Sequence, residues 1–300
     1  MRKKKKAFRL FLALAVSLGI FIFLLNRLSF KKLIDVVSGT NLKFLSLALL
    51  ISALSNTLLI SWRWKMILAR LKQTISFKES LFIKMGTRIL PLKTDEISRV
   101  IYLKKIKDIP YPTAAFSVIS EYLLSVVVLL VFTAAGGVIY YVKNRDKIPF
   151  GWFFLSGAIF LKPKLKSKRM VKYWNIVKFY LGKSRLIFKD KKIVGITILY
   201  WGLDLLNVFL LSWALGNPLP IYALFFFIPL VAFIGNLPIS IGGLGLRELA
   251  LVSLFSPWGS FELLLALSLL YYFTEQLFPN FIAVVFSGFF FDKVAWSKKR

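Results

Sequence analysis

The sequence contains neither cysteine nor histidine. The absence of cysteine excludes disulfide bonds and thiolate nucleophiles, and the absence of histidine removes the commonest general base. The usual zinc sites are excluded as well, because they need cysteine or histidine ligands. Any proton chemistry must therefore use carboxylates, lysine or tyrosine. We predict no catalytic residue, no metal and no cofactor, and we expect the chain not to be an enzyme.

Acidic residues are scarce. The chain has 13 Asp and Glu against 42 Lys and Arg, which gives a formal net charge of +29. Nucleic-acid binding is the usual first interpretation of such a charge. Here the basic residues lie between long apolar runs, where the positive-inside rule of membrane proteins accounts for them. We therefore predict anionic membrane lipids as partners, and no nucleic acid.

Hydrophobic residues make up 58% of the sequence, more than the 45–50% that is typical of soluble domains. They form long runs, such as residues 42–61 and 193–215, each long enough to cross about 30 Å of hydrocarbon as a helix. Residues 1–25 resemble a signal peptide, but no small-residue cleavage site follows. We interpret residues 7–25 as a retained first span.

These runs predict an all-α polytopic membrane protein with one integral membrane domain, residues 1–300. We expect six full spans, at residues 7–25, 42–62, 113–141, 149–161, 193–215 and 261–291. Two further regions, 76–107 and 222–255, are broken by Pro91 and Pro238 and are predicted to form re-entrant helix pairs. If each of them crosses completely, the chain has eight spans. Residues 162–192 are predicted to form a basic amphipathic segment on the cytoplasmic surface.

The orientation follows from the distribution of Lys and Arg. With both termini in the cytoplasm, 34 of the 42 basic residues fall on the cytoplasmic side. We expect the chain in the plasma (inner) membrane of a prokaryote, with cytoplasmic N- and C-termini.

The two broken regions resemble one another. Each has a Leu-Pro break followed by an Arg and a Glu, and each precedes a span with a carboxylate, Glu121 in one case and Glu275 in the other. In the expected topology they enter from opposite faces, which is the arrangement of an inverted-repeat transporter. The sequence is therefore compatible with an inverted repeat whose site lies near the midplane, although the repeat is too short to establish a duplication.

Polar residues within the spans recur at helical spacing. An ionised side chain inside a membrane costs about 2.5–3.5 kcal/mol, so these stripes should face the bundle interior. The stripes are Glu121 with Ser117 and Ser125, Asp204 with Tyr200 and Asn207, Glu275 with Tyr271 and Ser268, and Arg63 with Ser52 and Asn56. Interhelical hydrogen bonding alone would also explain the Ser and Asn residues.

Two arginines follow the Leu-Pro breaks. Arg99 and Arg247 could hold a lipid phosphate by bidentate hydrogen bonds, or they could neutralise Glu96 and Glu248 locally. The glycines Gly242, Gly243 and Gly245 are not followed by Gly-Lys-Ser/Thr, which excludes a P-loop and any recognisable ATP site. Their expected role is a tight turn with close helix contact.

Tryptophans lie near the predicted span ends. We interpret them as an aromatic belt at the membrane surface; they are Trp62, Trp64, Trp152, Trp258 and Trp296.

Three motifs together resemble a known family. They are Ser61-Trp62-Arg63-Trp64, then Leu90-Pro91 with Asp95-Glu96 and Arg99, and then Leu237-Pro238-Ile239-Ser240-Ile241-Gly242-Gly243-Leu244-Gly245-Leu246-Arg247-Glu248. They are similar to the flippase-like family, which comprises the transmembrane region of lysylphosphatidylglycerol synthases and its stand-alone relatives. The resemblance implies movement of a modified lipid between leaflets. The aminoacyl-transfer domain of the synthases does not follow in this sequence, so we expect no synthase activity.

The leading hypothesis is a translocator for a lipid or lipid-linked anion. The predicted groove consists of Arg63, Pro91, Glu96, Arg99, Glu121, Asp204, Pro238, Gly242, Gly243, Gly245, Arg247, Glu248 and Glu275. One alternative is a membrane-embedded transferase in which Asp95 and Glu96 bind Mg²⁺ with a substrate phosphate. Another is a non-transporting membrane protein that organises a separate lipid-modifying enzyme.

Overall fold

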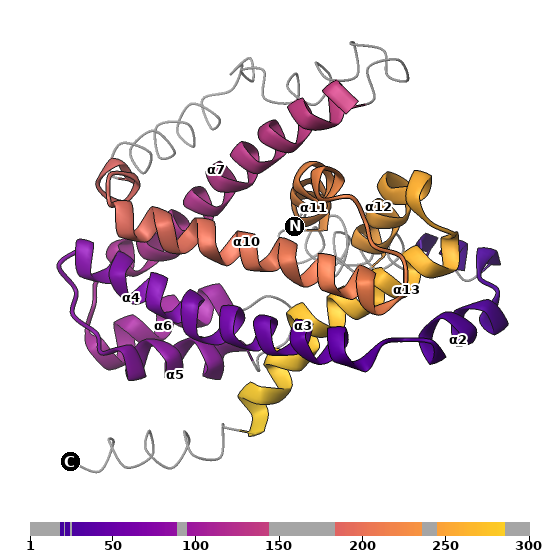
Figure 1. Cartoon of the computed structure of the whole chain (residues 1–300). Coiled ribbons are helices and arrows are strands. Elements are labelled where there is room, and N and C mark those ends of the chain that lie inside the picture. Colours follow the sequence, from indigo (N-terminus) through magenta and orange to yellow (C-terminus); the bar gives the residue numbers. More distant parts are fainter. Residues whose placement is uncertain are drawn as a thin grey trace, which may run out of the picture.

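The structure, a computed structural model, describes residues 19–20, 22–24, 26–88, 95–143, 184–235 and 245–285. These residues form helices joined by short turns, and no strand occurs among them, which confirms the all-α prediction (Figure 1). The elements are α2 (Phe30–Ser38), α3 (Leu42–Leu54), η1 (Ser55–Leu59), α4 (Ile60–Arg70), α5 (Phe77–Arg88), α6 (Asp95–Lys107), α7 (Tyr111–Lys143), α10 (Lys191–Ala214), α11 (Ile221–Gly235), α12 (Leu246–Phe255), η2 (Ser256–Trp258), α13 (Phe261–Tyr272) and η3 (Phe273–Leu277).

Four helices within the described ranges are long and apolar enough to cross a membrane. They are Leu42–Arg70, Tyr111–Lys143, Lys191–Ala214 and Phe261–Val285. They confirm four of the six predicted spans, although the first continues to Arg70 instead of ending at residue 62. The predicted span at 149–161 lies outside the described residues, as do most of the span at 7–25 and most of the basic segment at 162–192.

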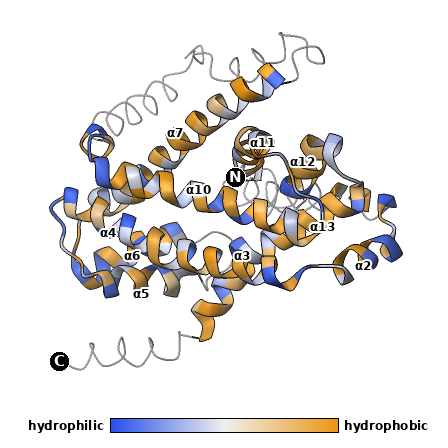
Figure 2. Cartoon of the chain, in the orientation of Figure 1, coloured by the Kyte–Doolittle hydropathy of each residue, from blue (hydrophilic) through white to orange (hydrophobic). Residues whose placement is uncertain are grey.

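These helices are hydrophobic over most of their length (Figure 2), and many of their large apolar side chains are exposed. Leu50, Val131, Leu199 and Phe281 are 55%, 59%, 49% and 64% exposed. A soluble protein rarely exposes such continuous apolar surface, whereas lipid chains solvate it at no cost. The distribution of side chains therefore fits a multi-pass membrane protein.

Two pairs of short helices occupy the regions that the Leu-Pro breaks interrupt. In the first pair, α5 and α6 have 12 and 13 residues, and in the second, α11 and α12 have 15 and 10. At 1.5 Å per residue each helix is about 15–22 Å long, which is less than the hydrocarbon thickness. The short lengths agree with broken pairs. The breaks themselves, residues 89–94 and 236–244, lie outside the described residues, and re-entry stays a prediction.

The second pair restarts at Gly245, which needs the conformational freedom of glycine. Its φ of +84° lies in the left-handed region, which side chains with a Cβ rarely adopt. The backbone N–H of Gly245 donates to Glu248 Oε2 at 2.6 Å, so the Glu248 carboxylate caps the first turn of α12.

The largest cluster of buried apolar side chains in the described residues lies mainly among the C-terminal helices. Leu211 of α10, Leu224 of α11, Leu251 of α12 and Leu264 of α13 are all at most 2% exposed. Between α7 and α11 the backbones approach closely, because a Cβ added to Gly136 would lie 2.5 Å from the backbone nitrogen of Phe226. This core and this contact hold the second broken pair against the long helices.

Two of the long helices contain π turns. One, η1, joins α3 to α4, and the other, η3, continues α13. A π turn contains an extra residue and is frequent at functional sites. The side chain of Asn56 in η1 donates to Glu275 Oε2 in η3 at 2.9 Å, so the two π turns meet through polar side chains.

Candidate functional site

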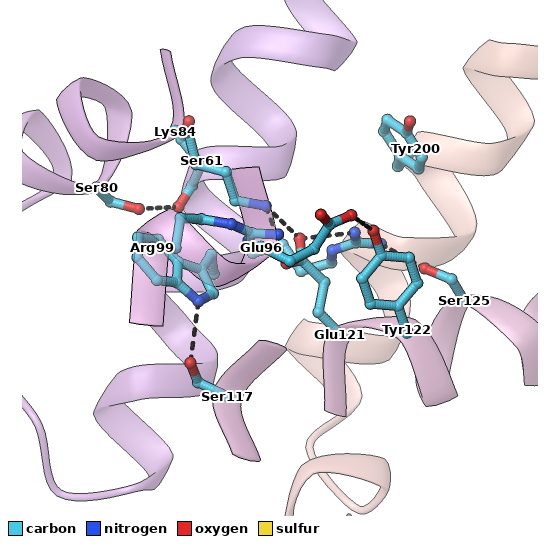
Figure 3. A network of polar contacts seen from close by, with 12 residues as sticks. Ser61, Ser80, Lys84, Glu96, Arg99, Ser117, Glu121, Tyr122, Ser125 and Tyr200 are labelled. Carbon is cyan, nitrogen blue, oxygen red and sulfur yellow. Dashed lines mark hydrogen bonds and ion pairs between the residues drawn. The ribbon is translucent and has the colours of Figure 1, made fainter. Parts of the chain in front are cut away.

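Glu121 of α7 accepts hydrogen bonds from three buried cations that come from three different helices. Its carboxylate lies 2.9 Å from Arg63 Nη2 of α4, 2.7 Å from Lys84 Nζ of α5 and 2.7 Å from Arg99 Nη1 of α6 (Figure 3). All four side chains are at most 8% exposed. We call these four residues the cationic cluster, and three cations against one carboxylate give it a formal charge of +2.

Aromatic faces complete the cationic cluster. Lys84 Nζ and Arg99 Cζ lie 5.7 and 5.3 Å from the centre of the Trp64 ring, and Arg63 Cζ lies 5.2 Å from that of Tyr200. Ring faces carry negative potential and stabilise cations that have lost water. The aromatic faces therefore offset part of the cost of burying excess positive charge.

Trp64 was assigned to the aromatic belt, and the structure corrects this prediction. Its side chain is fully buried, and its Nε1–H donates to Ser117 Oγ at 3.2 Å. The reason is that the helix continues to Arg70, so Trp64 lies within the span rather than at its end. Trp62, two residues earlier, is 52% exposed, as a belt residue would be.

Arg63 has donors beyond those that Glu121 uses. Its Nη1 donates to Ser125 Oγ at 3.2 Å, while its buried Nε has no hydrogen-bond partner among the described residues. A buried charge is tolerated only when it is paired, and this cluster has two positive charges more than negative ones. The arrangement suits a small anion with several oxygens, such as a phosphate, better than a lone carboxylate.

A second polar site lies where α3, α10 and α13 meet. Glu275 Oε1 accepts from Ser52 Oγ at 3.3 Å and from Asn207 Nδ2 at 3.1 Å. Asp204 accepts from the Tyr271 hydroxyl at 2.9 and 3.1 Å. The two carboxyl groups are only 2% and 6% exposed. We call Asp204 and Glu275 the acidic pair.

Arg247 approaches the acidic pair through aromatic rings. Its guanidinium Cζ lies 5.4 Å from the ring centre of Tyr271 and 4.6 Å from that of Tyr272. Its Nη2 donates to the neighbouring Glu248 at 3.3 Å. Of the two roles expected for Arg247, the structure shows local pairing with Glu248.

Tyr200 and Asn56 connect the two sites. The Tyr200 ring lies against the guanidinium of Arg63 in the cationic cluster, and the Tyr200 hydroxyl donates to Asn56 Oδ1 at 3.2 Å. Asn56 in turn donates to Glu275 of the acidic pair. By helical rise, Asn56 lies about 21 Å from either end of the span Leu42–Arg70, and Arg63 lies about 10 Å closer to Arg70. The acidic pair is therefore near mid-span.

The predicted groove residues separate into these two sites. The cationic cluster contains Arg63, Arg99 and Glu121, while Asp204 and Glu275 form the acidic pair. Glu96 lies beside the cationic cluster, where its carboxylate accepts from the Tyr122 hydroxyl (Figure 3). Pro91, Pro238, Gly242 and Gly243 lie outside the described residues. The polar stripes do face the interior, as predicted.

The predicted stripe of Ser52, Asn56 and Arg63 is buried throughout. Ser52 and Asn56 contact Glu275, while Arg63, further along the same span, contacts Glu121. Asn56 lies within the π turn η1.

Lys84 was missed among the groove residues. In the sequence, Lys84 resembles the many other lysines of the predicted cytoplasmic segments. Ser80, one turn earlier, lies on the same helical face and was the available signal that this face is polar and buried. Ser80 is also buried, and its hydroxyl donates to the Ser61 carbonyl at 2.7 Å.

The family described as the lysylphosphatidylglycerol synthase TM region matches residues 10–283. A search of the curated proteins finds no match.

Proposed function

The chain belongs to the family of the lysylphosphatidylglycerol synthase transmembrane region, and on this premise we propose that it moves a phosphate-bearing lipid or lipid-linked anion between membrane leaflets. It is a multi-pass membrane protein of this family. The cationic cluster is the binding site for the phosphate of the headgroup.

The observation that carries the proposal is the convergence of three buried cations, from three helices, on the single carboxylate of Glu121. A phosphate has the oxygens to accept from Arg63, Lys84 and Arg99 at once, and charge-assisted bonds of this kind are the strong ones. Glu121 holds the three cations in position, and the arriving phosphate replaces its carboxylate on one or more of them. The bound state then carries less net charge than the free state, which favours binding inside a membrane.

The proposal includes an orientation. With both termini in the cytoplasm of a prokaryote, the Arg70 end of its span faces the cytoplasm, and the cationic cluster lies on that side of the midplane. Headgroups then enter from the inner leaflet, where anionic lipids attract the basic segments. A separate lipid-modifying enzyme would supply the lipid, and the chain itself would catalyse no covalent step.

Flipping of labelled lipids in reconstituted vesicles tests the proposal. The substrates would be fluorescent phosphatidylglycerol, its aminoacylated form, and a phosphate-free glycolipid. Lys84→Met and Arg63→Gln should each slow the two phospholipids about tenfold or more, because a hydrogen bond to a charged group contributes about 1.5–3 kcal/mol. The matched control is Arg70→Gln, on the same helix but 57% exposed and paired with Asp190.

Two results would contradict the proposal. One is that folded Lys84→Met and Arg63→Gln proteins flip the two phospholipids as fast as the parent protein does. The other is equally fast flipping of the phosphate-free glycolipid. Metal-dependent formation of a modified lipid would instead support the transferase alternative.

A further inference from the structure

The cationic cluster lies close to a lipid-facing surface where α6 packs on α7. Glu121 is buried, whereas Tyr122, the next residue of α7, is 47% exposed. On α6, Arg99 is buried, whereas Ile97 and Ile101 are 63% and 40% exposed. Residues two apart in a helix point in nearly opposite directions, so α6 presents Arg99 to the cluster and the two isoleucines to lipid. The cluster and the lipid are therefore separated here by a single layer of helices.

Two polar contacts between α6 and α7 lie side by side, one buried and one at the surface. The buried contact is the ion pair between Arg99 Nη1 and Glu121 Oε2 at 2.7 Å. The surface contact is the hydrogen bond that the Tyr122 hydroxyl donates to Glu96 Oε1 (Figure 3). Glu96 precedes Arg99 by less than one turn of α6, and Tyr122 follows Glu121 directly. We call these four residues the α6–α7 seam.

Other sides of the cationic cluster are closed by protein. On α5, Ile83 and Met85 flank Lys84, and both are buried. On α4, the fully buried Trp64 ring lies against the cations of Lys84 and Arg99. The α6–α7 seam is therefore the side from which a lipid can approach.

The α6–α7 seam also lies at the depth of lipid headgroups. By helical rise α7 is about 50 Å long, so when it is centred on about 30 Å of hydrocarbon it extends about 10 Å beyond each boundary. Glu121 lies about 15 Å from Tyr111 at the start of α7, which places it about 5 Å inside the boundary. The phosphate of a lipid in that leaflet is therefore beside the seam before it binds.

We propose that the α6–α7 seam is the portal through which a phosphate-bearing lipid reaches the cationic cluster from the side. The phosphate passes between Glu96 and Tyr122. The acyl chains stay outside, against Ile97 and Ile101 of α6 and against Ile119, which is partly exposed one turn before Tyr122 on α7. The portal rests on the proposed function, because it concerns the lipid whose phosphate the cluster binds. Such a lipid is held by charge-assisted hydrogen bonds at its phosphate and by van der Waals contact along its chains.

Photo-labelling of the full chain in vesicles tests where the chains of the bound lipid lie. A benzophenone amino acid would be placed at Ile97 or, as the matched control, at Val131, which is 59% exposed and lies about 15 Å beyond Glu121 on the same helix. The vesicles would consist of a phosphate-free galactolipid with a trace of radiolabelled phosphatidylglycerol, or of a radiolabelled galactolipid with the same chains. Phosphatidylglycerol should label Ile97 several-fold more than the galactolipid does, while Val131 should be labelled equally by both.

The cationic cluster must be the cause of this preference. The excess label at Ile97 should disappear in Lys84→Met, with label at Val131 reporting that the variant is folded and inserted. Should Lys84→Met fail to fold, inorganic phosphate should remove the excess from the parent by competition. The portal is overturned if both positions show the same preference, or if the excess at Ile97 survives the loss of Lys84 or the addition of phosphate.

Locking the α6–α7 seam tests passage of the phosphate. Because the chain has no cysteine, Glu96→Cys and Tyr122→Cys can be bridged together by a short bis-methanethiosulfonate reagent and released by a reductant. The bridge should stop flipping of phosphatidylglycerol, and the reductant should restore it in the same vesicles, which excludes misfolding as the cause. The matched control bridges Lys104→Cys to Asp108→Cys, an exposed pair within α6, and leaves the seam free.

Failure of the portal and failure of the proposed function give different results. If the bridged seam flips phosphatidylglycerol as fast as the reduced seam, the portal is wrong and the proposed function stands. If the reduced double variant is inactive, the label at Ile97 in the parent decides. If the parent flips the phosphate-free lipid equally fast and inorganic phosphate does not stabilise it, the proposed function is wrong and the portal is wrong with it.

Discussion

Replacing Glu121 by glutamine removes the carboxylate that Arg63, Lys84 and Arg99 share. Removing one partner of a buried ion pair costs about 3–5 kcal/mol, because the other charge is left buried and uncompensated. Here three cations lose a partner at distances of 2.7–2.9 Å, so we expect the upper part of that range. At about 2–4 °C per kcal/mol, the Tm should fall by about 8 °C or more.

Inorganic phosphate should restore much of this loss. If the cationic cluster binds phosphate, a concentration of 100 times Kd stabilises the folded state by about 2.7 kcal/mol. The effect should be larger in Glu121→Gln than in the parent, because the competing carboxylate is gone. The assay is thermal unfolding in detergent at one scan rate and constant ionic strength, with and without phosphate.

A control separates the cluster from ordinary surface charge. Asp108→Asn removes an exposed carboxylate that pairs with Lys104, and solvent screens such exposed pairs so that they contribute little to stability. Its Tm should stay close to that of the parent, and phosphate should not stabilise it preferentially. The reasoning is refuted if Glu121→Gln is as stable as the parent, or if phosphate leaves its Tm unchanged.

Three further outcomes are expected. Asp190 caps α10, and although burial raises the pKa of this carboxyl, hydrogen bonds from Arg70 and from the backbone hold the pKa below its ordinary value. Asp190→Ala should therefore cost about 1 kcal/mol of stability at neutral pH. Unfolding at graded pH should show that the contribution of Asp190 is lost only as the pH falls below the usual range of aspartate. Gly136→Ala should lower the Tm sharply, while Gly195→Ala, which meets open space, should not. Because the chain has no cysteine, single cysteines at Lys189 and Gly39 should react with an impermeant thiol reagent from the cytoplasmic and the outer side respectively, and the opposite pattern would invert the topology.

Which residues share a helical face could be predicted from the sequence. Residues three or four apart in a helix share a face, so Ser117 and Ser125 could be placed with Glu121 from spacing alone. Because an ionised side chain is costly in lipid, each polar stripe was predicted to face the bundle interior. The structure confirms this, since the residues of the stripes are buried.

Which side chains of different helices meet could not be predicted in this way. Glu121 meets Arg63 across 58 residues of chain, and no local pattern determines which buried stripe faces which. Lys84 was hidden for a related reason: a lysine reveals its burial only when the helices that cover it are placed. The two π turns also escaped prediction, because nothing in the local sequence marked them.

The π turn η1 has a consequence for how the protein tolerates change. Because η1 already accommodates one extra residue, inserting another between Ser55 and Leu59 would rotate everything beyond it by about 100°. Both halves would still be apolar and long enough to insert, so the chain would reach the membrane. Arg63 would then leave Glu121 while Asn56 kept Glu275. Membrane insertion tolerates the added residue, whereas the relative orientation of the two sites does not, and alignments of relatives should show no insertion at this turn.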